Sequence, residues 1–185
     1  MKKILITGNK NFGLAKALYS LYPDAFFASR ENGFELTSSE GQKKLVEIIH
    51  EYDVIINSSA LWKFNQTVLL DQIYKSTVAR SRRPHIICIG STTDRVKKGG
   101  AWLYNAEKKA LRDYCNTLGL GGVWHGGPKI TLISFGSLSN VQEKHPERKC
   151  LSIDRAAEYI KWIVEQPSDI CVNEISIDPL QVPYE

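Results

Sequence analysis

The order in which short strand-like runs meet small or polar residues is the feature that most restricts the fold of this chain. Three such runs, with the residues that follow them, are Lys3–Thr7 with Gly8, Val54–Ile56 with Asn57, and Ile86–Gly90 with Ser91. Short, almost continuously apolar strands are typical of a parallel sheet that helices cover on both faces. The carboxyl ends of parallel strands meet at one edge of the sheet, where ligands bind in open α/β folds, so we expect these end residues to lie together.

The rest of the chain continues the alternation of strands and helices. The expected strands are Lys3–Thr7, Asp24–Arg30, Asp53–Asn57, Ile86–Ser91, Lys129–Phe135 and Asn173–Ile177, with Phe34–Leu36 as a vestigial strand. The expected helices are Leu14–Leu21, Ser39–His50, Asn65–Ser81, Leu103–Leu118 and Ile153–Glu165. This pattern predicts an α/β fold with a single doubly wound, Rossmann-type parallel sheet and helices on both faces. No repeat or linker interrupts it, so we predict one domain over residues 1–185.

Composition and charge exclude several classes of protein. The net charge is only +4, and the one dense basic cluster, Arg80–Arg83, precedes Pro84. Cations favour a helix C-terminus and proline stops a helix, so we prefer a solvated helix end to a nucleic-acid patch. No apolar run approaches the roughly 20 residues that span a bilayer, and we see no signal peptide, so we expect no membrane association. The four cysteines form no CxxC pair, which favours a cytoplasmic protein without a metal site.

The turn after the first strand is a candidate nucleotide site. Glycines between a strand and a helix let backbone N–H groups approach a pyrophosphate at the helix N-terminus. The residues assigned to this site are Gly8, Asn9, Lys10, Asn11, Phe12 and Gly13. Their spacing is not G-x-G-x-x-G, so a plain strand–helix turn is an alternative of about equal weight.

Two further strand ends extend the candidate nucleotide site. In a doubly wound sheet, the end of the second strand lies beside the adenosine ribose, where an acidic residue repels a 2′-phosphate and an arginine accepts it. This chain has Ser29 and Arg30 there, which favours NADP(H) over NAD(H); the alternative is that Arg30 is only a surface cation at a strand end. At the end of the middle strand, Asn57 and Ser58 are candidates to bind the nucleotide or the neighbouring strand-end backbone.

Ser91, Tyr104 and Lys108 form a candidate catalytic group. Tyr104 and Lys108 are four residues apart and share one helix face. A nearby ammonium lowers the pKa of a phenol, and such a tyrosine exchanges a proton with a carbonyl or alcohol oxygen. Ser91 ends a buried strand and is expected to present its hydroxyl at the same edge, with Thr92 and Thr93 as competing candidates. Asn65 begins a helix and is either its N-cap or a polar member of a proton relay.

With these residues, the chain resembles the short-chain dehydrogenase/reductase family from end to end. The matching segments are Ile6–Gly8 and Phe12–Ala15 for the glycine-rich turn, Asn57–Ala60, Phe135–Gly136, Ser152–Ala157 and Glu174–Asp178. Asn65, Ser91, Tyr104 and Lys108 match the family's catalytic tetrad in order and approximate spacing. The resemblance implies an NAD(P)-binding Rossmann domain and an oxidoreductase that interconverts a carbonyl and an alcohol.

The resemblance also implies a role for each residue. Tyr104 would be the general acid, Lys108 would lower the Tyr104 pKa and hold the nicotinamide ribose, Ser91 would orient the substrate carbonyl, and Asn65 would hold a relay water. Hydride would come from NADPH. The polar segment between Gly136 and Ile153, which helps form the substrate lid in the family, favours a small or polar substrate. The helices that start near residues 65 and 103 often form a dimer interface, so we expect a homodimer or homotetramer.

Two other functions stay open. A catalytically weak or inactive dinucleotide-binding regulator on the same fold is favoured by the irregular glycine turn, whereas the Ser–Tyr–Lys set favours an enzyme. A nucleotide-sugar epimerase or dehydratase uses the same tyrosine and lysine chemistry, but such enzymes usually carry a larger C-terminal substrate region.

Overall fold

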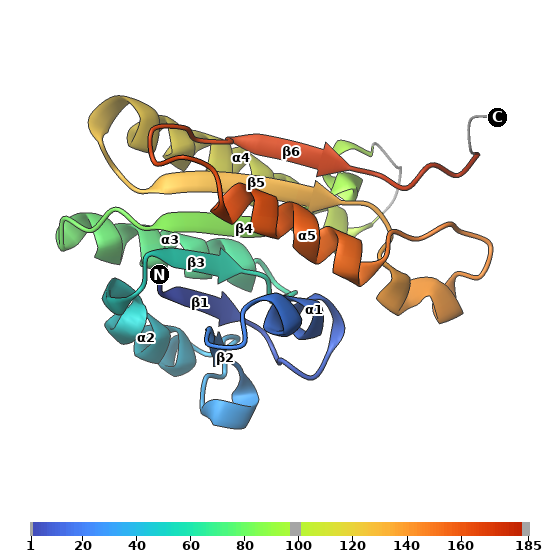
Figure 1. The fold of residues 1–185 in the computed structure, drawn as a ribbon, viewed down its shortest axis with the longest axis horizontal. Helices are drawn as coiled ribbons and strands as arrows, with labels where there is room; N and C mark the ends of the chain where they lie inside the picture. The colour runs from blue at the N-terminus through green and yellow to red at the C-terminus, as the bar shows by residue number, and fades with distance from the viewer. Residues whose placement is uncertain (1, 97–100, 183–185) are drawn as a thin grey trace.

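Six parallel strands form the centre of the part that the computed structural model describes, residues 2–96 and 101–182, in the spatial order β2-β1-β3-β4-β5-β6 (Figure 1). The strands are β1 Ile4–Thr7, β2 Phe26–Ala28, β3 Val54–Asn57, β4 His85–Ser91, β5 Lys129–Phe135 and β6 Glu174–Ile177. The α-helices are α1 Gly13–Leu21, α2 Ser39–Ile48, α3 Asn65–Ala79, α4 Leu103–His125 and α5 Ile153–Val164. Short 3-10 helices are η1 Arg30–Asn32, η2 Ile49–Glu51, η3 Thr92–Arg95 and η4 Ser139–Lys144.

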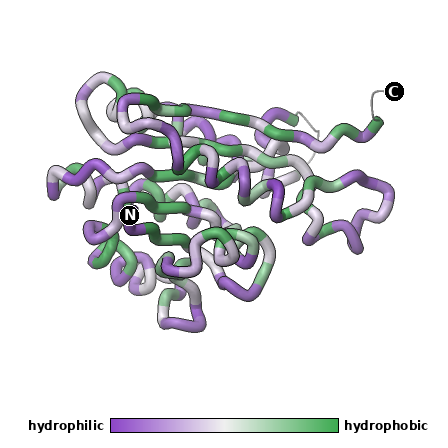
Figure 2. The backbone as a smooth tube through the Cα atoms, viewed as in Figure 1, coloured by the Kyte–Doolittle hydropathy of each residue, from purple (hydrophilic) through white to green (hydrophobic). Residues whose placement is uncertain are grey.

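Alternate residues of each strand enter two separate apolar cores. Ile6 and Ile56 pack with α1 and α5 on one face of the sheet, whereas Leu5 and Ile55 pack with α2, α3 and α4 on the other. Figure 1 shows the sheet between these two helical layers, and Figure 2 shows hydrophobic residues concentrated along the central strands. Strands buried on both faces explain the nearly continuous apolar runs in the sequence. The predicted doubly wound α/β fold is confirmed.

Local sequence signals account for several element boundaries. Ser38 and Ser152 cap α2 and α5, because each hydroxyl accepts a backbone N–H from the first turn of its helix. The chain leaves α3 through Arg80 and Ser81, the latter with a φ of 54°, so the basic cluster lies at a helix end, as predicted. None of the helices in the described ranges is long and apolar enough to cross a membrane.

Several predicted boundaries were wrong. The second strand covers Phe26–Ala28 rather than Asp24–Arg30, and Arg30 begins η1. Phe34–Leu36 is not a strand, because the Leu36 carbonyl accepts a hydrogen bond from Gln42 Nε2 (2.8 Å) and the segment leads directly into α2. Consequently β2 is an edge strand among the described residues. Helix α4 continues beyond Leu118 to His125, where Gly126 ends it with a φ of 68°.

Candidate functional site

The glycine turn joins β1 to α1 at the carboxyl edge of the sheet. Gly8 and Gly13 have φ values of 135° and 52°, a backbone region that side chains other than glycine rarely adopt. A Cβ on Gly8 would lie 3.1 Å from the Cβ of Ala15, so Gly8 also lets the turn pass close to α1. Helix α1 begins at Phe12 without a side-chain cap and has no acidic residue in its first turn. Its N-terminal N–H groups are therefore suited to an anion such as a pyrophosphate.

A cavity of about 320 Å³ lies between this turn and the end of β2, and Lys10, Ser29, Glu31 and Asn32 contribute to its lining. Lys10 Nζ lies 5.2 Å from the centre of the Tyr19 ring, which also lines the cavity. Of the residues predicted to bind the nucleotide, Lys10 and Ser29 line this cavity, and its other lining residues come from the end of α1, the segment before β2, and β2 with η1.

Arg30 lies outside that cavity. Its side chain is 82% exposed, and its Nε is 3.8 Å from Glu35 Oε2, so it is a loosely held surface cation. Ser29 precedes it and forms a capping box with Asn32, whose side chain accepts a hydrogen bond from Ser29 N (2.8 Å). The end of β2 is thus a rigid turn with a mobile guanidinium beside it.

Asn57 and Ser58 support the strand ends. Asn57 is fully buried, its Nδ2 donates to the Gln66 carbonyl (3.2 Å), and its carbonyl accepts from Gln66 Nε2 (2.9 Å). Ser58 Oγ donates to the Thr7 carbonyl (2.6 Å), and Ser58 N donates to Thr7 Oγ1 (3.0 Å). The sequence left two roles open for Asn57 and Ser58, nucleotide binding and support of neighbouring backbone. In the structure, both residues form hydrogen bonds with neighbouring backbone groups.

Ser91 and Tyr104 meet at the carboxyl end of β4. The Ser91 side chain is close enough to Tyr104 to influence its pKa, and the centre of the Tyr104 ring lies 5.5 Å from that of the Trp62 ring. Burial and the charge of Glu107 raise the pKa of Tyr104, while the Ser91 side chain opposes this rise. The expected lowering of the Tyr104 pKa was therefore wrong, because desolvation of the phenol outweighs the favourable contacts.

Lys108 lies behind Tyr104 on α4. Its Nζ is 5.6 Å from the centre of the Tyr104 ring, donates to Gln66 Oε1 (2.7 Å) and donates to the Ile89 carbonyl (3.2 Å). The residue is only 7% exposed, and burial lowers the pKa of Lys108 to about 8. The predicted proximity of the two side chains holds, with the lysine bound to the protein interior.

Asn65 does not cap α3. Phe64 is the N-cap, and Asn65 Nδ2 donates to the Trp62 carbonyl in the preceding loop (2.7 Å). The polar partner of Lys108 is instead the next residue, Gln66, which the sequence analysis did not identify. No local pattern marks that contact, since 42 positions separate the two side chains.

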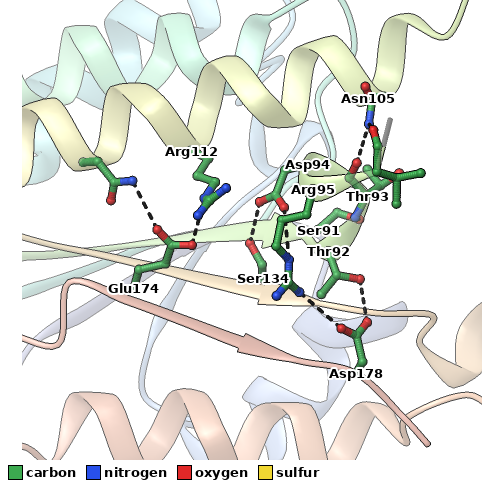
Figure 3. Close-up of polar contacts among 12 residues, drawn as sticks. Ser91, Thr92, Thr93, Asp94, Arg95, Asn105, Arg112, Ser134, Glu174 and Asp178 are labelled. Atoms are coloured by element: carbon green, nitrogen blue, oxygen red, sulfur yellow. Dashed lines mark hydrogen bonds and ion pairs between the residues drawn. The ribbon is translucent and has the colours of Figure 1, made fainter. Parts of the chain in front are cut away.

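A polar network fixes η3, the short helix after Ser91 (Figure 3). Buried Asp94 accepts a hydrogen bond from Ser134 Oγ on β5 (3.1 Å), and burial raises the pKa of Asp94. Thr92 Oγ1 and Arg95 Nη2 both donate to Asp178, at 2.6 and 3.2 Å. Thr92 is engaged in this way, whereas Ser91 is the hydroxyl that influences the pKa of Tyr104.

The network in Figure 3 crosses the end of β5 to reach the residue after β6. Gly136 makes this crossing possible, because a Cβ there would lie 2.5 Å from Asp178 Oδ1. On the other side of the site, η4 approaches the glycine turn: a Cβ on Gly13 would lie 3.8 Å from Asn140 Nδ2. The candidate lid segment therefore begins beside the candidate pyrophosphate position.

Solved structures with this architecture are dehydrogenases. Serine dehydrogenase from Escherichia coli has a TM-score of 0.73 and 17% identity, covering 98% of this chain and 99% of that chain. A short chain dehydrogenase from Burkholderia cenocepacia in complex with NADP has a TM-score of 0.73 and 16% identity, covering 96% of each chain. Acetoin dehydrogenase from Salmonella typhimurium has a TM-score of 0.72 and 17% identity, covering 97% and 95%. The chain shares the α/β fold of these dehydrogenases.

Sequence comparison gives a shorter match. An uncharacterised oxidoreductase of Listeria monocytogenes is 25% identical in an alignment of 114 residues that covers 54% of this chain and 46% of that relative. The match thus spans less than half of the relative's length. No family model matches the chain.

Proposed function

We propose that this protein is an NAD(P)(H)-dependent oxidoreductase that interconverts a carbonyl and an alcohol, with residues 1–185 acting as one nucleotide-binding domain. The observation that carries the proposal is the grouping of Ser91, Tyr104 and Lys108 at the same sheet edge as the glycine turn. The fold and the Listeria relative support the same reaction class. A small polar substrate agrees with the serine and acetoin dehydrogenases among the similar structures.

Tyr104 and Ser91 would bind the substrate oxygen together. When bound, NADPH would supply the hydride. The Tyr104 hydroxyl, whose pKa is raised, is protonated at neutral pH and can donate its proton to the carbonyl oxygen as negative charge develops there. Ser91 would hold that oxygen in place as a second hydrogen-bond donor.

Lys108 would act through its charge. Its pKa of about 8 keeps it mostly protonated at pH 7, and its Nζ lies 5.6 Å from the centre of the Tyr104 ring. A cation beside the ring stabilises the phenolate that remains after proton transfer. Gln66 would position Lys108 by accepting its hydrogen bond at 2.7 Å.

NADP(H) is proposed as the preferred cofactor. Lys10 and Ser29 line one cavity at the end of β2, and Arg30 is free to turn towards a 2′-phosphate because it is 82% exposed. Complexes with NADP or NADPH among the similar structures agree with this choice.

Calorimetric titration of NADPH and NADH, followed by a carbonyl screen with Tyr104→Phe, tests the proposal. We expect NADPH to bind in the micromolar range and more tightly than NADH. The Tyr104→Phe variant should bind NADPH with nearly unchanged affinity and lose at least about 100-fold in turnover, the usual contribution of a general acid. Retained turnover in this variant would reject Tyr104 as the proton donor.

A dinucleotide-binding regulator is the second candidate. Two observations favour it, because each shows a proposed catalytic side chain bound to the protein itself. The Lys108 ammonium donates hydrogen bonds to Gln66 Oε1 and the Ile89 carbonyl. The Asn65 amide donates to a loop carbonyl. Tight NADPH binding with no turnover on any small carbonyl would support the regulator.

We also propose a cytoplasmic homodimer or homotetramer that forms through α3 and α4. Both helices carry exposed apolar side chains, with Val68 and Val78 on α3 and Leu120, Val123 and Trp124 on α4. Burial of these exposed apolar side chains in a contact between two copies would favour association. The molecular mass in solution tests this, and a strict monomer would reject it.

A further inference from the structure

Trp62 lies beside the proposed proton donor. The centre of its ring is 5.5 Å from that of the Tyr104 ring, and the two ring planes are tilted by 52°. The Trp62 residue is 61% exposed, although tryptophan is highly buried on average in folded proteins. Trp62 therefore contacts Tyr104 with part of its ring and leaves much of its apolar surface open next to that side chain.

The Trp62 loop, residues 61–64, has an unusual backbone. Lys63 and Phe64 have φ values of 58° and 60°, and of the described residues other than glycine only Ser81 is also at positive φ. Two successive residues of this kind are strained, and such strain persists only where the surrounding structure holds it. Strained backbone is concentrated at functional sites, so the cause of this conformation bears on the site beside it.

Glu107 on α4 holds the Trp62 loop in this conformation. Its Oε1 accepts hydrogen bonds from Lys63 N (2.5 Å) and Phe64 N (3.3 Å). Hydrogen bonds from backbone N–H groups to a carboxylate are stronger than neutral ones, and Glu107 is only 6% exposed. Glu107 lies one helical turn after Tyr104, so these bonds connect the loop to the part of α4 that carries the proposed proton donor.

We propose that Glu107 is a positioning residue that holds the Trp62 loop against α4, and that Trp62 forms one side of the substrate site and binds an aryl group on the carbonyl carbon. This proposal rests on the proposed function, in which Tyr104 and Ser91 hold the carbonyl oxygen. A substituent of that carbon lies close to Tyr104, where the exposed indole offers an apolar ring. An aryl group gains more from packing against it than a small alkyl group does. The small polar substrate is thereby narrowed to an aryl ketone or aldehyde with small polar substituents.

Amide hydrogen exchange measured by NMR tests the role of Glu107 without cofactor or substrate. In Glu107→Ala, the amides of Lys63 and Phe64 lose their acceptor and should exchange at least about tenfold faster than in wild type. Glu107→Gln keeps a carbonyl oxygen that can accept both hydrogen bonds, so exchange should stay within about threefold of wild type. Unchanged exchange in Glu107→Ala would overturn the positioning role.

Reduction of 2-hydroxyacetophenone and of acetoin with NADPH tests the role of Trp62. Both probes are α-hydroxyketones, and only the first carries a phenyl ring. Trp62→Ala should raise KM for 2-hydroxyacetophenone at least about tenfold with little change in kcat, because the lost contact binds substrate and transition state alike. KM for acetoin should change by less than about threefold. The control Trp162→Ala removes a tryptophan on α5 that is 47% exposed and should behave as wild type.

The Glu107 variants separate the position of Trp62 from the charge of Glu107. Glu107→Ala should raise KM for 2-hydroxyacetophenone as Trp62→Ala does. Glu107→Gln should keep the wild-type KM and change only kcat, since it removes the charge that acts on Tyr104 and retains the loop. An equal rise of KM in Glu107→Gln would assign the effect to charge and overturn the positioning role.

Other results would overturn the role of Trp62. Unchanged KM in Trp62→Ala, or an equal rise of KM for both ketones, would show that the indole does not bind the aryl group. A wild-type protein that binds NADPH and does not reduce 2-hydroxyacetophenone would also reject it. Absence of NADPH binding would reject the proposed function itself, whereas amide exchange would still decide whether Glu107 holds the loop.

Discussion

The histidine at the start of β4 makes the folded protein less stable at acidic pH. His85 is 8% exposed, and its Nε2 lies 2.7 Å from Thr131 Oγ1. Burial, and then the charges of Lys129 and Lys2, lower the pKa of His85 from 6.5 to about 4. The unfolded chain therefore binds a proton at a higher pH than the folded chain does. Stability is fully present above pH 6.5 and is lost as the pH falls from 6.5 towards 4.

The magnitude follows from the same shift. At about 1.4 kcal/mol per pKa unit, the full loss is about 3 kcal/mol, of which about 2 kcal/mol occurs between pH 7 and pH 5. Urea unfolding at several pH values measures it. The variant His85→Phe should lose about 2 kcal/mol less than wild type across this interval, because its other groups still titrate.

A control and a refuting result define the test. His125→Phe removes an exposed imidazole at the end of α4 and should keep the pH dependence of wild type. If His85→Phe and wild type lose the same stability between pH 7 and pH 5, burial of a neutral His85 does not govern acid sensitivity.

Two further substitutions probe the edges of the site. Gly136→Ala would place a Cβ 2.5 Å from Asp178 Oδ1 and 2.8 Å from Pro179 Cδ, so urea unfolding should show a loss of about 1–3 kcal/mol. Gly119→Ala, whose Cβ would meet only Ile130 at 3.9 Å, should instead be neutral or stabilising within α4; equal effects would contradict the steric argument. Arg30→Asp should shift calorimetric preference towards NADH, and unchanged selectivity would show that Arg30 does not contact the 2′-phosphate.

The fold could be predicted because its signals are local. Strands buried on both faces require unbroken apolar runs, and the runs at Ile4–Thr7, Val54–Asn57 and Lys129–Phe135 are visible without knowledge of their neighbours. The end of α4 was missed because several glycines near it indicate a turn. Packing against β5 keeps that segment helical, with Gly122 so close to Pro128 that a Cβ would lie 2.3 Å from its carbonyl oxygen.

The site could be predicted where one element supplies both partners or where a residue ends a parallel strand, as Ser91 does. Tyr104 and Lys108 share a helix face, so their proximity follows from spacing alone. The contacts that decide their chemistry come from elsewhere in the chain. Glu107 Oε1 accepts Lys63 N (2.5 Å) and Phe64 N (3.3 Å), both residues with positive φ. This arrangement fixes the loop that carries Trp62, and nothing in the local sequence indicates it.

Desolvation determines the resting state of the proposed catalytic pair. The same burial raises the pKa of Tyr104 and lowers the pKa of Lys108 to about 8. If the charge of Lys108 were the dominant influence, it would lower the pKa of Tyr104 and favour the phenolate. A phenolate is the base that oxidation of an alcohol requires. With Tyr104 neutral at pH 7, the protein instead holds a proton donor beside Ser91. In the proposed enzyme, this state favours reduction, because a carbonyl oxygen needs the proton that Tyr104 retains.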